Sequence, residues 1–506
     1  MSARVDAIVT LDAGTGSGRC VVVDRDGHVL AKAQEPFVYD VVVDPAMPMV
    51  RGFDLQPDRF WAALAGCARR AMGALPAGVH IRGVIATSQR EGCVFLDGEG
   101  RVLYAGPNLD ARAAMEGLEL LSLVPPARLH AITGHAPPYI FPLARWLWYR
   151  KHHDAGRVAT LLMLNDWIGH LLSGARVVEE SNACESMLFD VTARAWSDEI
   201  LDATGVPRAI LPSVCRAGTA IGTVTAAAAA ATGIPAGVPV FAGGADTESA
   251  LLGGGVMDIG ATGAILGTTA PVQMVVERPL VDPAGNLWTS CHVVPDRWVL
   301  ESNGGDTGGT FRWLLELLFG GSDAAAHARA EAAVAAIADD GRHLVAHIGP
   351  AIFNLAEMNP FQPAGMIFPF PMLHLDRPTR GDFLRGFFEN VAFAIRGNCE
   401  QITAVSGRAI DRLCVSGGMT QSPTLLGILA ATLQVPLVVA DVPESASVGS
   451  AVLAAVGAGL YPDVASAVAG MVRTHEVVPD ASRATSLEAR YHRWYELYST
   501  LRSWTL

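Results

Sequence analysis

The chain opens with short apolar runs separated by turn-forming residues. Residues 7–12 form an apolar run that ends in an acid, Asp12, and residues 20–23 form a second, β-branched run. Asp26-Gly27 then precedes Val29-Leu30, and Asp-Gly between apolar runs is a hairpin signal. The pattern predicts a strand, a glycine loop, a second strand, a turn and a third strand.

Beyond this opening, the spacing of apolar residues alternates between helical and extended. In the first half it predicts a helix over 59–72, a strand over 81–87 and a hairpin of 93–96 with 101–104. In the second half it predicts helices over 309–319, 324–338, 383–405 and 423–433, with strands over 413–416 and 437–440. Both halves are therefore predicted to be α/β with mixed sheets.

The opening arrangement recurs near the middle of the chain. Residues 239–242 run into glycines and an acid, Asp246, and residues 258–269 indicate a strand, a turn and a loop rich in hydroxyl groups. Two halves that each begin with a strand, an acid and a glycine loop indicate duplicated domains facing each other across a cleft. We expect an N-terminal domain of residues 1–254 and a C-terminal domain of residues 255–506.

Composition narrows the class of protein. Half of the 506 residues are hydrophobic and 17% are charged, which excludes a disordered chain. The net charge of −13 disfavours nucleic acid as a partner. Lysine occurs only at Lys32 and Lys151, and neither follows a glycine or lies in a V-A-I-K strand. A Walker A loop and the protein-kinase pattern are therefore excluded.

The sequence also indicates where in the cell the protein resides. Residues 1–12 carry Arg4 and Asp6 and no long apolar run, so they predict no signal peptide. The apolar stretches 226–231 and 448–460 are too short or too glycine-interrupted to span a bilayer. Eight cysteines without C-x-x-C spacing predict reduced thiols. We expect a cytoplasmic protein with no membrane partner and no structural zinc site.

The first glycine loop, Gly14-Thr15-Gly16-Ser17-Gly18, has three interpretations. A dinucleotide fingerprint needs G-x-G-x-x-G and a following helix, whereas here the spacing is shorter and a strand follows. A tight hairpin whose glycines only satisfy the turn is the simplest interpretation. In the third, the backbone N–H groups of the loop converge on a phosphate. The similar arrangement around Asp246 favours the third.

Three loops, Asp12–Arg19, Gly267–Thr269 and Ser416–Met419, resemble in order and content those of the sugar kinase/actin/Hsp70 superfamily. The specific resemblance is to the FGGY family of carbohydrate kinases, which includes autoinducer-2, glycerol and xylulose kinases. It extends from Ile8 to about Gly459. It implies an α/β fold with two ribonuclease H-like (actin-like ATPase) domains, whose mixed sheets flank a central cleft.

The resemblance also implies an ATP site. The phosphate-loop patterns D-x-G-T-x-S-x-R and G-T-S/T and the adenosine pattern G-G-x-x-x-S/N are all matched, and Glu444–Ala451 matches the closing pattern with Ser450 in a usual alanine place. The residues implied to bind ATP are Gly14, Thr15, Gly16, Ser17, Arg19, Gly267, Thr268, Thr269, Gly417, Gly418, Gln421 and Ser422. The resemblance assigns Mg²⁺ to Asp12 and Asp246, and makes Asp246 the general base. Taken alone, Asp12 could cap its own turn and Asp246 the following helix.

The acceptor site is implied by two further segments. Ser88–Gly92, with the sequence S-Q-R-E-G, resembles the Q-R-E of glycerol kinases and the M-R-E-G of autoinducer-2 kinases, where xylulose kinases have Q-M-H-G. Asp110-Ala-Arg112 resembles the D-A-R of autoinducer-2 kinases. The implied acceptor-binding residues are Gln89, Arg90, Glu91, Asp110, Tyr139, Asp246 and Thr247. Arg90 taken alone could form a surface ion pair. Arg145, at a lysine position of the family, and Ser181-Asn182-Ala183 are predicted to be structural.

We therefore predict an ATP- and Mg²⁺-dependent phosphotransferase with an alcohol acceptor. The acceptor is a small open-chain sugar, ketose or polyol, similar to autoinducer-2, xylulose or glycerol. Glu91 in place of a histidine weakens xylulose, although a ketopentose stays open. A homodimer is a family expectation. Two alternatives are an actin- or Hsp70-like ATPase, which the acceptor residues argue against, and a catalytically silent sugar-binding regulator, which Asp12 and Asp246 argue against.

Overall fold

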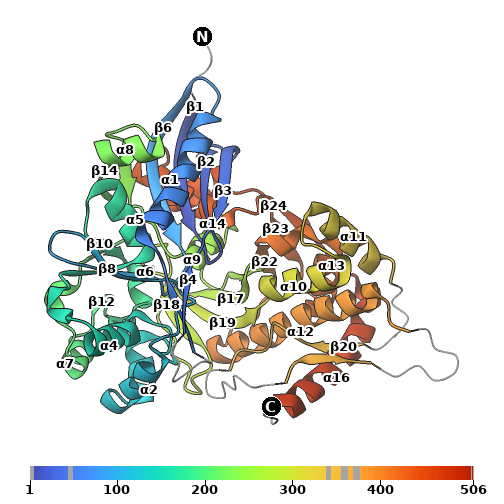
Figure 1. Ribbon diagram of the computed structural model, residues 1–506. Helices are drawn as coiled ribbons and strands as arrows, with labels where there is room; N and C mark the ends of the chain where they lie inside the picture. The colour runs from blue at the N-terminus through green and yellow to red at the C-terminus, as the bar shows by residue number, and fades with distance from the viewer. Residues whose placement is uncertain are drawn as a thin grey trace.

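The computed structural model describes residues 5–43, 50–337, 344–354, 363–368, 377–502 and 504. Its framework is two large mixed sheets, one in each half of the chain (Figure 1). The first has the order β14 (Ala220–Thr223), β15 (Pro239–Phe241), β6 (Val79–Ser88), β1 (Val5–Ala13), β2 (Ser17–Asp24) and β3 (Val29–Pro36). The second has the order β18 (Trp288–Cys291), β19 (Trp298–Asp306), β17 (Thr269–Val276), β16 (Thr262–Ile265), β22 (Leu413–Ser416), β23 (Leu437–Ala440) and β24 (Thr474–Val477).

The first sheet is covered on both faces. Alternate side chains of a strand point to opposite faces. Val9 and Leu11 pack with α1 (Pro57–Gly73) and α5 (Leu164–Ser173), whereas Ile8 packs with α14 (Ser445–Gly457). The red-orange α14 lies against the blue strands in Figure 1. The chain therefore returns from its second half to complete the core of its first sheet.

The second sheet packs against long helices. Its core includes side chains of α10 (Gly308–Phe319), α11 (Ala324–Ala335), α12 (Arg380–Ser406) and α13 (Pro423–Leu433). The C-terminal α16 (Ala484–Arg502) contacts α12 and α13. Helix α12 begins with a capping box at Thr379 and ends at Gly407 in the left-handed conformation, a common helix stop.

Smaller elements surround this framework. The remaining strands are β4 (Asp40–Val43), β5 (Arg51–Asp54), β7 (Cys93–Leu96), β8 (Val102–Gly106), β9 (Thr160–Met163), β10 (Val177–Glu179), β11 (Phe189–Asp190), β12 (Ala195–Trp196), β13 (Ser213–Cys215), β20 (Val345–His347) and β21 (Gly365–Ile367). The remaining α-helices are α2 (Ala114–Leu123), α3 (Pro126–Thr133), α4 (Pro142–His152), α6 (Glu180–Cys184), α7 (Asp198–Thr204), α8 (Ala226–Thr232), α9 (Asp246–Gly253) and α15 (Val464–Met471). Short 3₁₀ helices cover Ala155–Arg157, Arg208–Ile210, Gly418–Gln421 and Ala481–Arg483.

The predicted α/β class with mixed sheets is confirmed. The helix predicted over 324–338 ends earlier, at Ala335, and Ala338 lies outside the described residues. The predicted domain boundary falls between α9 and β16, but α14 packs on the first sheet, so the division stays a prediction. All eight cysteines lie in described segments and are free. In the described part of the chain, no helix combines the length and apolarity needed to cross a membrane.

Candidate active site

Three chain segments meet at one end of the first sheet. Strand β1 is parallel to β6, so their C-terminal ends lie side by side, with Ala13 opposite Ser88. A further bridge joins Ser88 to Ala245, the residue before Asp246. Asp12, Glu91 and Asp246 are therefore delivered to the same edge, where ligands of open α/β sheets commonly bind.

Asp12 and Asp246 are two acids in a poorly hydrated setting. Asp12 lies inside β1, not in the loop, and receives the guanidinium of its cross-strand partner Arg19 at 3.3 Å. Burial raises the pKa of Asp12 despite Arg19. Burial, helped by the charge of Asp12, raises the pKa of Asp246 to about 7. Asp246 is the first residue of α9 and makes no helix cap, because the cap position belongs to Ala245. Carboxylate oxygens are ligands that Mg²⁺ takes from proteins, so the chemistry of Asp12 and Asp246 fits this ion.

The first phosphate loop is short and braced from outside. Only residues 14–16 separate β1 from β2. Gln89 reaches the Gly14 carbonyl at 3.4 Å, and its own amide oxygen accepts the Asn108 N–H at 2.8 Å. The Asn108 side chain in turn donates to the Thr15 hydroxyl at 3.0 Å. Gln89 therefore supports the loop, and its predicted contact with the acceptor stays a prediction.

The second phosphate loop and the adenosine loop are packed together. The Thr307 and Gly308 N–H groups donate to the carbonyls of Thr268 and Gly267, at 2.8 and 3.0 Å. Gly417 adopts φ 98°, and a Cβ there would lie 2.6 Å from the Leu266 carbonyl oxygen, one residue before Gly267. Both constraints require glycine.

Ser422, predicted to bind adenosine, has its hydroxyl bonded within the protein. It caps α13, accepting the Leu425 N–H at 3.1 Å, and its hydroxyl donates to Glu331 at 2.6 Å. Its hydroxyl is thus occupied within the protein, whereas Gly418 and Gln421 lie in the short helix before it. Their contact with adenosine stays a prediction.

Asp110 is saturated by protein groups. It is fully buried, accepts the Phe53 N–H at 3.1 Å and the Arg112 Nε at 2.8 Å, and also accepts the Tyr104 hydroxyl. Asp110 therefore orders the segment after β8. Its direct contact with the acceptor stays a prediction.

Glu91 is the predicted acceptor residue whose carboxyl lies beside the Arg90 guanidinium, with Oε1 4.0 Å from Nε. Its backbone is left-handed, at φ 58°, and is held by Arg145, whose Nη1 donates to the Glu91 carbonyl at 2.8 Å. Burial and the nearby Glu185 raise the pKa of Glu91 to about 8. Tyr139 is half-buried in the segment before α4. Arg145, predicted to be structural, is fully buried and supports Glu91 from behind.

Family models match nearly the whole chain. The N-terminal domain model of the FGGY family of carbohydrate kinases matches residues 7–253, and the C-terminal domain model matches residues 263–458. This chain belongs to the FGGY family. An autoinducer-2 kinase of Yersinia pestis bv. Antiqua (strain Angola) is 31% identical over 98% of this chain and 94% of its own length.

Solved structures agree with this assignment. The xylulose kinase of Rhodospirillum rubrum is 27% identical, with a TM-score of 0.81 over 98% of this chain and 99% of that one. The glycerol kinase of Plasmodium falciparum with ADP has a TM-score of 0.82 over 98% of each chain, and at 18% identity it shows the fold alone. The predicted resemblance, two-domain fold and activity class are confirmed: the protein is an ATP-dependent carbohydrate kinase, a phosphotransferase with an alcohol acceptor.

In this FGGY kinase, the structure adds residues that no motif indicated. Arg90 lies among carboxylates: its Nη1 is 2.6 Å from Glu301, 3.8 Å from Glu185 and 3.9 Å from Glu248. Glu301 is 211 positions away in the sequence and belongs to the second sheet. Three glutamates from a helix, a strand and the residue after α6 carry no recognisable spacing, so only the folded chain shows their convergence.

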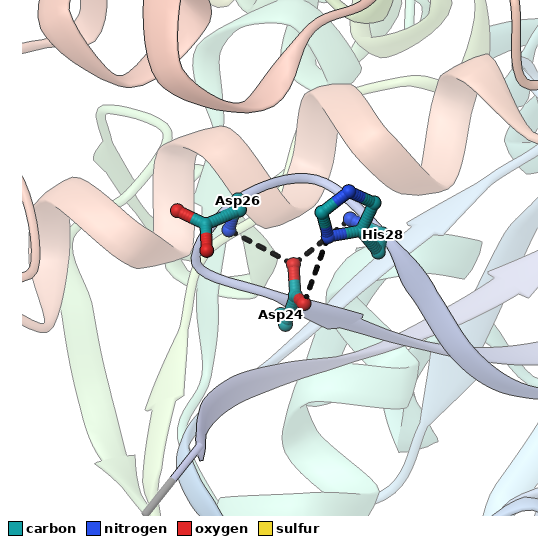
Figure 2. A group of neighbouring side chains, drawn as sticks. All are labelled: Asp24, Asp26 and His28. Carbon is teal, nitrogen blue, oxygen red and sulfur yellow. Dashed lines mark hydrogen bonds and ion pairs between the residues drawn. The ribbon is translucent and has the colours of Figure 1, made fainter. Parts of the chain in front are cut away.

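A separate acidic group of this FGGY kinase belongs to a turn. Asp24, Asp26 and His28 surround the tip between β2 and β3 (Figure 2). Asp24 accepts the N–H groups of Asp26 and His28 at 2.9 and 2.8 Å and the His28 ring at 3.1 Å. These bonds are those of an Asx-type turn and account for the arrangement. The Asp-Gly hairpin predicted here is confirmed.

Proposed function

We propose that this kinase transfers the γ-phosphoryl group of Mg²⁺-bound ATP to a hydroxyl of a small open-chain sugar or polyol held beside Glu91 and Asp246. The observation that carries the proposal is the pair of carboxyls at one sheet edge, with Arg90 beside them. Arg90 Nε and Glu91 Oε1 are 4.0 Å apart. Two hydrogen bonds of about 2.8 Å that meet at one hydroxyl oxygen span about that distance.

The chemistry needs positioning more than covalent assistance. The loops at residues 14–16 and 267–269 would lie against the phosphates, and Asp12 and Asp246 would hold Mg²⁺, which would supply neutralising charge. The acceptor oxygen attacks the γ-phosphorus as the bond to ADP breaks. Its proton passes to the Asp246 carboxylate. Arg90, Glu91, Tyr139 and Thr247 line the acceptor, with Gln89 and Asp110 supporting them.

The substrate class follows from these groups. An open-chain polyhydroxylated molecule presents adjacent hydroxyls, which donors and acceptors such as Arg90 and Glu91 match. The autoinducer-2 kinase relatives support a linear acceptor of that kind. The likeness to a xylulose kinase favours a ketopentose as a second candidate. We also propose a cytoplasmic homodimer with two domains that close on ATP, the dimer to be tested by light scattering.

The test is an ADP-release assay with sugar phosphate measured in parallel. The panel is glycerol, erythritol, erythrulose, ribulose, xylulose and the autoinducer-2 precursor, each with wild type and Glu91→Gln. We expect turnover with open-chain members and loss of acceptor affinity in the variant. Turnover that is independent of every acceptor would contradict the proposal and favour an ATPase with another role.

A further inference from the structure

We propose that Glu301 is a positioning residue of the acceptor site: by holding both terminal nitrogens of Arg90, it ties residues 88–92, the acceptor loop, to the strands that carry the second phosphate loop. The inference rests on the proposed acceptor site. It adds Glu301, a residue from the opposite half of the chain that lies in none of the family patterns found in the sequence.

Arg90 packs against a row of three side chains that lie opposite one another on neighbouring strands of the second sheet. Glu301 on β19 lies opposite Gln273 on β17 and opposite Trp288 on β18. Residues directly opposite on neighbouring strands share one face of the sheet. Arg90 sits on this row, with its Cζ 5.5 Å from the centroid of the Trp288 ring, a cation–π distance.

Glu301 itself is fully occupied. Its Oε2 accepts Arg90 Nη1 at 2.6 Å and Gln273 Nε2 at 2.7 Å. Its Oε1 accepts Arg90 Nη2 at 2.8 Å and Asn303 Nδ2 at 3.1 Å. A buried carboxylate with four donors has one stable orientation. The guanidinium is therefore held end-on, with its Nε edge turned toward Glu91.

The surrounding charges make this arrangement sensitive to change. Arg90 Nη1 also lies within 4.0 Å of Glu185 and Glu248, which are both fully buried. Each of them has one carboxylate oxygen without a hydrogen bond in the described structure. If Glu301 loses its charge, Arg90 can turn toward either carboxylate, because a buried cation seeks the nearest anion. The acceptor loop would then move with it.

The same strands lead to the phosphates. Gln273 is four residues beyond Thr269, where the second phosphate loop enters β17. Glu301 lies on β19, which ends at Asp306, and the next two residues, Thr307 and Gly308, hold that loop through their N–H groups. A contact at Glu301 thus sets the distance from the acceptor to the γ-phosphate, and a shift of about 1 Å can cost about 100-fold in rate.

The test is Glu301→Gln, measured for the KM of both substrates, kcat, and the ratio of ADP released to sugar phosphate formed. We expect kcat/KM for the acceptor to fall about 10- to 100-fold. We expect the KM for ATP to stay within about twofold, because the phosphate loops keep their own bonds, and the ADP ratio to rise as water replaces a misplaced acceptor. Arg90→Lys should show the same defect, and the double variant should add little to either single one.

Glu488→Gln is the matched control. Glu488 receives both terminal nitrogens of Arg396, at 2.6 and 3.0 Å, in the same end-on geometry between α12 and α16. Its kinetics should equal those of the wild type. If Glu301→Gln does not fold, Glu301→Asp replaces it in the test. This variant keeps the charge but shortens the side chain by one methylene, and the same fall in kcat/KM for the acceptor is expected.

Some outcomes overturn the inference. Wild-type acceptor KM and coupling in a folded Glu301 variant would refute it, as would equal losses for both substrates with an unchanged ADP ratio. If the wild type is active and a Glu301 variant gives either of these two results, this inference alone is overturned. A wild type without acceptor turnover overturns the proposed function and the inference together.

Discussion

The Ser181 hydroxyl accepts the backbone N–H of Ala245 at 3.0 Å, one residue before Asp246. The same hydroxyl donates to Glu179 at 2.5 Å. Asn182 holds the preceding Gly243 carbonyl at 3.2 Å, and Asn165 also donates to it. The segment predicted to be structural therefore fixes the chain that delivers the proposed general base.

Ser181→Ala should lower kcat by about tenfold or more, because Ala245 loses its partner and the direction of Asp246 is less well defined. The buried N–H left without a bond should also cost about 1–3 kcal/mol of unfolding free energy. Steady-state kinetics and urea denaturation measure the two effects. Ser186→Ala is the control, since Ser186 is equally buried but its hydroxyl donates to the Ala183 carbonyl and accepts the Leu188 N–H. Equal kinetic losses in both variants would contradict a positioning role.

Asp246→Asn should leave the fold intact and reduce kcat by about 10²- to 10⁴-fold, the usual contribution of a general base. The asparagine keeps the size of the side chain but cannot take the proton. Circular dichroism and the sugar-phosphate assay provide the comparison. Acceptor-stimulated turnover near the wild-type level would remove Asp246 from the base role.

The pH dependence should report the same carboxyl. Burial and the charge of Asp12 raise the pKa of Asp246 to about 7, and only the ionised form accepts a proton. The kcat/KM for the acceptor should therefore fall on the acid side with a midpoint at or below about pH 7, because Mg²⁺ held beside Asp246 favours the ionised carboxylate. The profile is measured at constant free Mg²⁺ over roughly 1.5 pH units on either side of that pKa. A flat acid limb would contradict the assignment.

Gly417→Ala should destabilise the adenosine loop. The φ of 98° costs an alanine about 1–2 kcal/mol, and its Cβ would press on the Leu266 carbonyl. The neighbouring Gly267 should shift, so the KM for ATP should rise while that for the acceptor changes little. Gly407→Ala is the control, because Gly407 has φ 67° but open space around its Cβ position. A KM for ATP as unchanged as in the control would show that the loop does not contact the nucleotide.

Local signals predicted much of the fold correctly. Helix α13 spans Pro423–Leu433 as predicted, because Ser422 caps it, proline suits its first turn and Gln434 ends it in the left-handed conformation. The β1–β2–β3 meander was likewise readable, since its turn residues and apolar runs are neighbours in the sequence. The helix over 324–338 was predicted too long, because an alanine-rich run contains no stop signal before Ala336.

For the candidate site, too, local patterns were visible in the sequence and long-range contacts were not. The sequence by itself determined which segments are candidates for the two phosphate loops, the acceptor loop and the acids Asp12 and Asp246, because each lies in a contiguous pattern that resembles the family's. The tertiary structure alone decided that Glu301 holds Arg90, that Gln89 and Asp110 are bonded within the protein, and that α14 covers the first sheet. The physical reason is that such contacts join residues far apart in the chain, and their partners are selected by sheet register and burial, which no local spacing records.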